Sequence, residues 1–418
     1  MDLQAFGDLR APEGREALAA AMRSDLSESG LLATATRLRE RHPPELVQAA
    51  LTQARLRRRA RAKFGPDADV MYFTHAGLEQ STRASVAAYR ARRFADVLGS
   101  EGTVLDLGCG IGADLIARAR AGRPGEGVER DPLTAEVARA NLAALGLDGL
   151  ASVRVGDALA QDPAGYAAVF ADPGRRTARG RVFDPRSYEP PLDAVLALAR
   201  QAPAACVKAA PGIPHEAIWD ADPAVEAEWI SVGGEVKEAA LWLGDLAGPA
   251  SARRRATLIP GDGEGAGGEI TTLAPEEGLG EPPVGDWGRY LYEPDGAVIR
   301  AGLVAEVAAR VGGWLADPRI AYITSGTLVP TPFAAAYEIE DALPFSVKRL
   351  RAELRRRRPG SLTIKKRGSA VDVDRLRHDL GFGRRAAGRD GGELTLVLTR
   401  VGDDPVALLA SRAHRRSP

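Results

Sequence analysis

Apolar residues recur at spacings of three and four through most of residues 12–98, which is the pattern of amphipathic helices. The stretch is rich in alanine, leucine and arginine, residues that favour helices. Within residues 50–65 the pattern places Leu51, Ala54 and Leu56 inward and the arginines outward, as on a bundle, with nucleic-acid contact as the alternative. We predict an N-terminal helical domain over residues 1–98, with helices over residues 15–22, 28–41, 44–64 and the second part of 73–99.

From Gly102 onward, short apolar runs alternate with amphipathic segments. A β-α-β-α order of this kind predicts a parallel sheet with helices on both faces. Ligands in such sheets bind at the carboxyl ends of the strands. Residues 226–233 and 235–244 then predict an edge hairpin, followed by a strand over residues 254–259. We therefore assign residues 99–259 to a single α/β domain that ends in an antiparallel hairpin.

The last third of the chain predicts a second, smaller α/β domain. Residues 260–286 are rich in glycine and acidic side chains and have little to bury, so we expect a flexible linker there. In residues 287–418, short apolar runs typical of strands again alternate with amphipathic segments typical of helices. We predict helices over residues 301–316, 345–358 and 372–381, and strands over residues 319–325, 361–368 and 393–402.

The charges are balanced over the chain and unbalanced within it. Lys+Arg and Asp+Glu both total 56, but from Pro344 to the end 19 basic residues face 8 acidic ones. A basic module attached to an acidic body favours a polyanionic partner. The alternative is an ordinary solvated surface.

Cysteine and histidine positions argue against disulfide and metal chemistry. Cys109 and Cys206 lack the paired spacing of a zinc site, and His75, His215 and His378 each stand alone. Cys206 sits inside an apolar strand, which disfavours a nucleophilic role. The N-terminus lacks the apolar core of a signal peptide, and no long uncharged apolar run occurs. We expect a cytoplasmic, soluble protein without a metal.

The clearest motif is the glycine-rich stretch after the first predicted strand of the α/β domain. Gly108, Gly110 and Gly112 follow a G-x-G-x-G spacing, and Asp106 precedes them. Glycines here let a backbone approach a ligand, and the helix that follows presents free N–H groups. A pyrophosphate fingerprint would place its third glycine at Ala113, although it tolerates alanine there. An anion at Asp106 instead suits a cationic ligand.

Two further carboxylates end the next two strands. Glu129 is placed to accept from ribose hydroxyls, and Asp157 is placed to accept from an adenine amino group. Together with the glycine loop, this set resembles the class I, Rossmann-like methyltransferases over residues 102–244. The resemblance implies S-adenosylmethionine as cofactor, with Asp106 and the loop backbone at the methionine end. The predicted cofactor-binding residues are Asp106, Gly108, Cys109, Gly110, Gly112, Glu129 and Asp157, with Cys109 in a packing role.

The strand after Asp157 carries the substrate-side signal. Methyltransferases that act on amino groups of bases have Asn or Asp, Pro, Pro and an aromatic residue at this place. Asp172 and Pro173 match the start of that pattern, but Gly174 and Arg175 replace the rest, which disfavours exocyclic amines. Arg175 and Arg176 offer guanidinium groups for phosphate contact. Salt bridges to the acidic body are an equal alternative.

Lys208 ends the next strand, and Glu238 precedes the strand after it. An Asp, a Lys and a Glu near the donor methyl would resemble the 2′-O-ribose RNA methyltransferases, but their first lysine is missing before the glycine loop. Asp172 and Lys208 remain the predicted catalytic residues, and Asp172 is the better candidate for contact with the acceptor.

The C-terminal module combines a basic helix with a basic strand. Its helix can point four cations outward together, and its strand ends in Lys365, Lys366 and Arg367, predicted substrate-binding residues. The outward cations are Lys348, Arg351, Arg355 and Arg358. The motifs LTIKKRG, VDVDRLRHDLG and LTLVLTRVG resemble the THUMP-like domain behind a methyltransferase core in a bacterial, notably actinobacterial, family. The upstream KFGPDADVMYFTHAGLEQSTRASVA matches the same family.

Because THUMP domains proper bind RNA, the resemblance implies an RNA partner, by analogy of fold. We predict a methyltransferase that modifies structured RNA such as tRNA or rRNA. The alternatives are a small-molecule or protein methyltransferase and a non-catalytic RNA-binding protein that retains the cofactor pocket. The sequence leaves the oligomeric state open.

Overall fold

The computed structural model describes residues 1–99, 102–174, 188–261, 268–382 and 392–413, together with the backbone of residues 176–177 and 180–181. The chain divides into two compact units. The first comprises residues 1–227 and 238–250, and the second comprises residues 228–237 and 251–418. The chain passes between them within β8 (Glu226–Val232), within β9 (Glu235–Gly244) and after Ala250.

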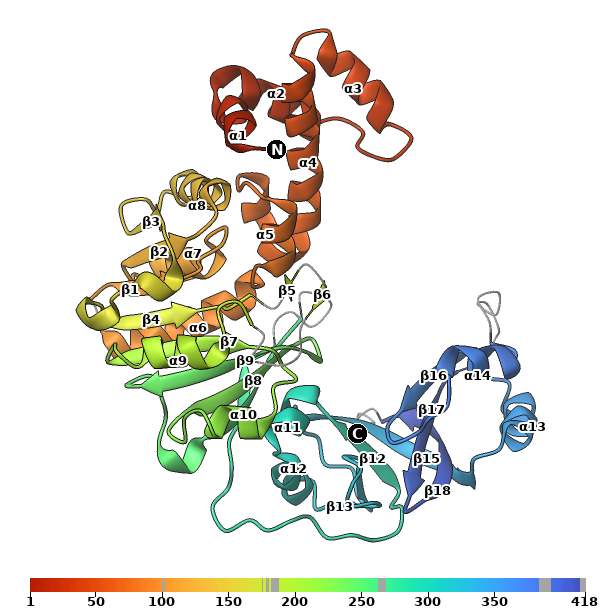
Figure 1. Ribbon diagram of the computed structural model, residues 1–418. Coiled ribbons are helices and arrows are strands. Elements are labelled where there is room, and N and C mark those ends of the chain that lie inside the picture. Colours follow the sequence, from red (N-terminus) through yellow and green to blue (C-terminus); the bar gives the residue numbers. More distant parts are fainter. Residues whose placement is uncertain are drawn as a thin grey trace. The chain divides into compact units, whose positions relative to one another are not determined.

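The first unit begins with helices that confirm the predicted pattern (Figure 1). The structure adds a first helix whose N-terminus is capped by the Asp2 carboxylate, which accepts from Ala5 N at 2.9 Å. Buried leucines and alanines of these helices form a shared core that includes Leu18, Val47 and Ala50. The helices are α1 (Leu3–Arg10), α2 (Pro12–Met22), α3 (Leu31–Arg39), α4 (Pro44–Phe64), α5 (His75–Gln80) and α6 (Ala84–Leu98).

One arginine of α4 contradicts the predicted outward orientation. Arg57 is buried and donates to the carbonyl oxygens of Met71 at 2.8 Å and Asp69 at 2.7 Å. Its guanidinium also lies over the Tyr72 ring. A guanidinium can be buried where backbone carbonyls satisfy its donors. Arg57 therefore fixes the turn after α4, which leads toward α5.

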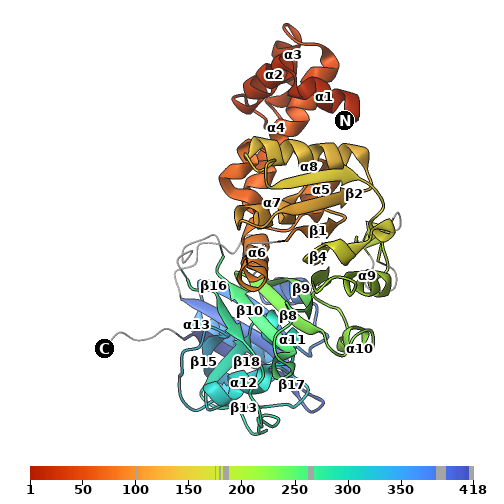
Figure 2. The same cartoon turned by 90° about the vertical axis from the view of Figure 1, so that its left-hand side faces the viewer.

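The sheet of the first unit has the order β9-β7-β4-β1-β2-β3. The pairs among β7, β4, β1, β2 and β3 are parallel, as predicted. Strand β7 also pairs antiparallel with β9. Helix α9 (Leu192–Ala199) packs against β4 and β7, whereas α8 (Pro132–Ala144) packs against β2 and β3 (Figure 2). The remaining elements are β1 (Val104–Leu107), α7 (Ala113–Arg120), β2 (Gly125–Glu129), β3 (Ala151–Val155), β4 (Ala168–Ala171), β7 (Ala204–Ala209) and α10 (His215–Trp219).

The second unit contains a seven-stranded sheet with the order β13-β14-β12-β15-β18-β17-β16. Its strands are β12 (Tyr290–Pro294), β13 (Trp314–Leu315), β14 (Ile323–Ser325), β15 (Ala334–Pro344), β16 (Ser361–Lys366), β17 (Glu393–Val401) and β18 (Asp404–Arg412). Strand β10 (Arg254–Ile259) pairs antiparallel with β11 (Thr271–Leu273). Thus β11 lies inside the predicted linker, of which residues 262–267 are outside the described part of the chain.

The helices of the second unit differ from the prediction at one place. The expected helix over residues 301–316 is shortened to α12 (Val304–Arg310). Gly302 adopts a left-handed conformation with φ +67° and separates α12 from α11 (Gly296–Ala301), a helix that the sequence did not predict. Trp314 and Leu315 beyond α12 form β13. Helices α13 (Val347–Arg357) and α14 (Val373–Asp379) lie where they were predicted.

Candidate active site

The glycine loop joins β1 to α7 and folds back over the end of β2. The amides of Gly108 and Cys109 both donate to the carbonyl of Val128, at 2.8 and 3.1 Å. Gly108 and Gly110 have φ of +75° and +56°, a region that residues with a Cβ rarely adopt. Open space lies where a Cβ of either glycine would stand. The loop backbone is therefore exposed to a ligand at the carboxyl end of the sheet.

The side chain of Cys109 packs between this loop and β2. A Cβ placed on Gly127 would lie 2.7 Å from the Cys109 sulfur, so the side chain packs closely on β2. Burial raises the pKa of the Cys109 thiol well above its ordinary range, and the nearby Asp106 and Glu129 act in the same direction. A buried neutral thiol fits the predicted packing role.

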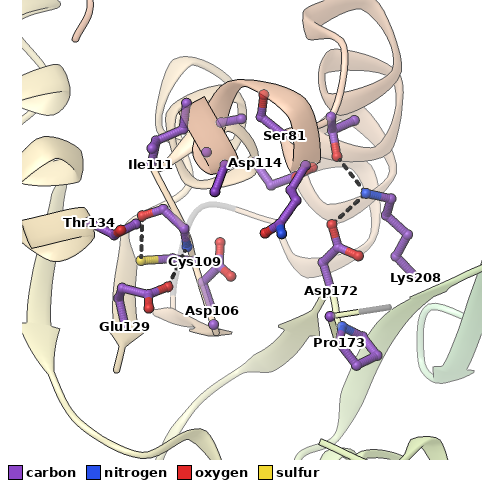
Figure 3. Close-up of a pocket in the computed structure, with 18 of the residues that line it drawn as sticks. Ser81, Asp106, Cys109, Ile111, Asp114, Glu129, Thr134, Asp172, Pro173 and Lys208 are labelled. Carbon is purple, nitrogen blue, oxygen red and sulfur yellow. Dashed lines mark hydrogen bonds and ion pairs between the residues drawn. The ribbon is translucent and has the colours of Figure 1, made fainter. Parts of the chain in front are cut away.

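A cavity of about 520 Å³ opens above the loop (Figure 3). Its wall combines the loop, the segment between α5 and α6, and the residues that end β4 and β7. A second cavity of about 460 Å³ adjoins it on the side of β3. The residues that line both are Gln80, Gly108, Gly110, Glu129, Asp172, Pro173 and Gly174. One elongated ligand can therefore occupy both cavities by passing the loop.

Asp106 lies in the wall of the first cavity with one carboxylate oxygen unsatisfied. The side chain is buried and its Oδ2 accepts from Arg118. Its Oδ1 is buried and has no hydrogen-bond partner within the described residues. Burial raises the pKa of Asp106 to about 6, although the Arg118 guanidinium opposes the shift. A cationic ligand atom beside Oδ1 would satisfy this oxygen and favour the ionised carboxylate.

Glu129 and Asp157, the predicted ribose and adenine contacts, both line the second cavity. Glu129 is fixed by two backbone amides, since it accepts from Gly110 N at 3.0 Å and from Asp131 N at 2.9 Å. Asp157 accepts from Leu159 N at 2.9 Å. A carboxylate has about four acceptor positions, so both side chains retain capacity for the hydroxyl or amino donors of a ligand.

Asp172 and Lys208 lie together at the first cavity, at the ends of β4 and β7. Lys208 is buried, forms an ion pair with Asp172 and donates to Thr82 Oγ1 at 3.2 Å (Figure 3). Thr82 also accepts from Arg90 at 3.2 Å. Sequence reasoning missed Gln80 and Thr82, because neither belongs to a strand-end motif and only the fold brings the α5–α6 segment over the sheet.

Behind Lys208 lies a group of buried charges centred on Arg90. Arg90 forms ion pairs with Asp114 and Glu238, and its side chain is almost fully buried. Burial alone would raise the pKa of Asp114, but Arg90, Lys208 and Arg118 together hold it below its ordinary value. Glu238 thus pairs with Arg90 and is absent from the lining of the first cavity. Glu238 therefore does not join Asp172 and Lys208 at the first cavity, as the alternative resemblance to the 2′-O-ribose RNA methyltransferases would require.

The predicted substrate-binding residues are divided between the two units. Pro173 lines both cavities. Arg175 lies outside the described residues, and so does the side chain of Arg176, whose backbone belongs to the two-residue strand β5 (Arg176–Thr177). Lys365, Lys366 and Arg367 belong to β16 and its end in the second unit.

The described part of the chain contains no cluster of three or more histidine, cysteine, aspartate or glutamate side chains arranged as metal ligands. None of the helices within that part is both long enough and apolar enough to span a lipid bilayer.

Comparison with known proteins identifies the family. A model described as THUMP domain-like matches residues 334–412, and one described as a domain of unknown function matches residues 2–60. The chain is 38% identical over 365 residues to an uncharacterized S-adenosylmethionine-dependent methyltransferase present in two strains of Mycobacterium tuberculosis. The match covers 86% of this chain and 93% of that protein.

A similar structure has been solved from Porphyromonas gingivalis W83, a crystal structure of a candidate methyltransferase. It superposes with a TM-score of 0.76 at 25% identity, covering 99% of this chain and 100% of that one. The glycine loop, the strand-end carboxylates and the two adjoining cavities agree with these likenesses. The chain belongs to the family of S-adenosylmethionine-dependent methyltransferases that carry a THUMP-like domain at the C-terminus.

Proposed function

We propose that this methyltransferase modifies structured RNA, such as tRNA or rRNA. The observation that carries the proposal is the match of residues 334–412 to the THUMP-like model, on a unit that exposes a row of cations. On α13, Leu350 and Leu354 are buried in the core. The outer side carries exposed cations without an ion-pair partner among the described residues: Lys348, Arg349, Arg351, Arg355 and Arg358. Of these, Arg351 donates to the Asp379 carbonyl at 2.8 Å. Such a row suits an RNA backbone.

The two adjoining cavities suit the two ends of the methyl donor. S-Adenosylmethionine supplies a methyl group on a sulfonium, which a nucleophile can displace. We place its ammonium beside the free Oδ1 of Asp106, its ribose at Glu129 and its adenine toward Asp157. Asp106 supports this orientation, because it lines the first cavity and one of its carboxylate oxygens has no hydrogen-bond partner among the described residues.

Asp172 is the group we assign to contact with the acceptor. It lines both cavities at the point where they adjoin, and its carboxylate accepts from Lys208. Its remaining acceptor capacity can receive an N–H or O–H of the acceptor and orient the lone pair that attacks the methyl group. Lys208 is a positioning residue in this account, since Thr82 and Asp172 fix its ammonium.

The test is transfer of label from methyl-labelled S-adenosylmethionine by the full chain to RNA from a strain that lacks its gene. We expect label that is released by ribonuclease and resists protease, with wild-type protein and not with Asp172→Asn. Protease-sensitive label would favour a protein substrate. Label in neither macromolecule, with donor binding intact, would remove the support for an RNA substrate.

A further inference from the structure

The second unit contains a cavity of about 780 Å³ that the methyl donor site does not use. Its volume lies within the range of sites for small molecules, roughly 300–1,000 Å³. Cations from two strands line it: Lys365 and Arg367 from β16 and its end, and Arg412 from the end of β18. We propose that this cavity binds the phosphate of a nucleotide, either free or within an RNA strand. The RNA source rests on the proposed function, whereas the site itself does not.

The strand register explains why these side chains meet on one face. Arg412 is the cross-strand neighbour of Tyr337, and Tyr337 is opposite Leu291. Lys365 is opposite Val397, and Val397 is opposite Leu408. Leu291, Tyr337, Val397 and Leu408 all belong to one apolar cluster. Because alternate residues of a strand share a face, Arg367 joins Lys365 on this side of the sheet.

An ion pair closes the sheet around the cavity. Lys365 Nζ lies 2.6 Å from Glu293 Oε2, although the strands of these residues, β16 and β12, are separated by three others in the sheet. The sheet is therefore strongly curved, and its concave face holds the cavity. Burial by itself would lower the pKa of Lys365, but the hydrogen bond and charge of Glu293 raise it above its ordinary value. Glu293 and Lys365 neutralise each other and leave Arg367 and Arg412 to meet an anion.

Both of these arginines have donors to spare. Arg367 lies over the Tyr322 ring at 5.3 Å, and its buried Nε has no hydrogen-bond acceptor within the described residues. Arg412 is exposed and has no ion-pair partner in the same part of the chain. Among the acidic side chains that line the cavity, Asp295 caps α11 and accepts a hydrogen bond from Ala297 N at 2.8 Å. Glu269 also lines the cavity, at its side near β11. A phosphate offers oxygens that can accept two parallel N–H hydrogen bonds from one arginine guanidinium.

This cavity is distinct from the cation row on α13. Helix α13 packs on the opposite face of the sheet. There Leu350 and Leu354 share an apolar core with those residues of β17 and β18 that point away from the cavity. Lys366 belongs to that opposite face, and its Nζ donates to the Val371 carbonyl at 3.0 Å. The three predicted basic residues at the end of β16 therefore serve two surfaces.

The site is tested by calorimetric titration of the full chain with AMP and with adenosine, in the absence of donor and RNA. We expect AMP to bind more tightly than adenosine. Arg412→Ala and Arg367→Gln should each weaken AMP binding about tenfold, the effect of one lost charge-assisted contact. The control is Arg289→Gln, which removes an exposed arginine of the same unit outside the cavity and should leave AMP affinity unchanged.

The source of the phosphate is resolved with a short single-stranded RNA, with and without a 5′-phosphate. If AMP binds and the RNA does not, the ligand of the cavity is a free nucleotide. If both AMP and the RNA bind, the ligand is an RNA strand. Equal binding of AMP and adenosine, or AMP binding unaffected by Arg412→Ala in a protein of unchanged melting temperature, would overturn the site. RNA methylation by that same protein would then leave the proposed function standing.

Discussion

Buried Lys208 and half-buried Asp172 form an ion pair where the two adjoining cavities meet, and Lys208 also donates to Thr82 Oγ1 at 3.2 Å. The pair links the ends of β4 and β7 to the segment between α5 and α6. Only one partner, Asp172, lines both cavities. In the proposed function, Asp172 contacts the acceptor and Lys208 holds Asp172 in position.

Substitution of Asp172 should therefore lower kcat alone, whereas substitution of Lys208 should lower both kcat and the melting temperature. Asp172→Asn should lower kcat by at least about a hundredfold, because a positioned acceptor of this kind contributes that much, with donor affinity changed little. Lys208→Met should lower kcat and also lower the melting temperature, since it leaves Asp172 without its partner. Steady-state kinetics and donor titration measure both. Wild-type kcat in Asp172→Asn would refute its assignment.

Donor binding should depend on pH through Asp106. Its pKa is raised from the ordinary 3.8 to about 6, so the carboxylate becomes protonated as the pH falls through 6. If the ionised form binds the donor ammonium, affinity should be full above that pH and fall below it, by up to about tenfold per pH unit. Asp106→Asn should bind weakly and without this dependence. Titration calorimetry between about pH 5 and about pH 7.5 measures it.

The same raised pKa has the opposite effect on the stability of the donor-free protein. The folded state binds the Asp106 proton more tightly than the unfolded chain does. This contribution to stability is fully present below pH 3.8 and is lost as the pH rises through about 6. In denaturant unfolding, Asp106→Asn should show a smaller loss over this window than the wild type. An identical pH profile for both proteins would contradict the assignment of the raised pKa to Asp106.

Removal of Arg90 should destabilise the first unit strongly. It leaves Asp114 and Glu238 buried without the guanidinium that forms an ion pair with both, and breaking a buried pair costs about 3–5 kcal/mol. Arg154→Gln is the matched control, because Arg154 and its partner Glu126 are more exposed, and such pairs contribute at most about 1 kcal/mol. Urea unfolding of both variants measures the difference. A loss of equal size in the two would show that the buried charges do not support the fold.

The cation row on α13 should control the salt dependence of RNA binding. Replacing Lys348, Arg355 and Arg358 by glutamine should reduce the slope of log K against log salt by about two to three, roughly one per lost contact. Arg289→Gln provides a charge control on the same unit. Filter binding across a salt series measures the slope. An unchanged slope would place the RNA surface elsewhere.

The sequence predicted the parallel sheet, the hairpin of β8 and β9 and the strand-end carboxylates, because each depends on local patterns: apolar runs, glycine spacing and an acid at a strand end. It placed the hairpin wrongly at the edge, since β10 and β11 continue the strand order beyond β8. It missed Gln80 and Thr82, which reach the cavities only through tertiary packing. It also missed β15 and β18, whose segments, AAAYEIEDALP and DPVALLASR, lack a clear alternation in their flanks. The separation of Lys366 from Lys365 and Arg367 follows from strand alternation, but the face that each would occupy depended on the register.

Mass spectrometry of RNA nucleosides from a strain lacking this gene is the decisive test of RNA as the substrate. We expect the loss of one methylated nucleoside, restored by the wild-type gene and not by Asp172→Asn or Asp106→Asn. A full set of methylated nucleosides in the deletion strain, unchanged by complementation, would contradict the assignment of RNA as the substrate.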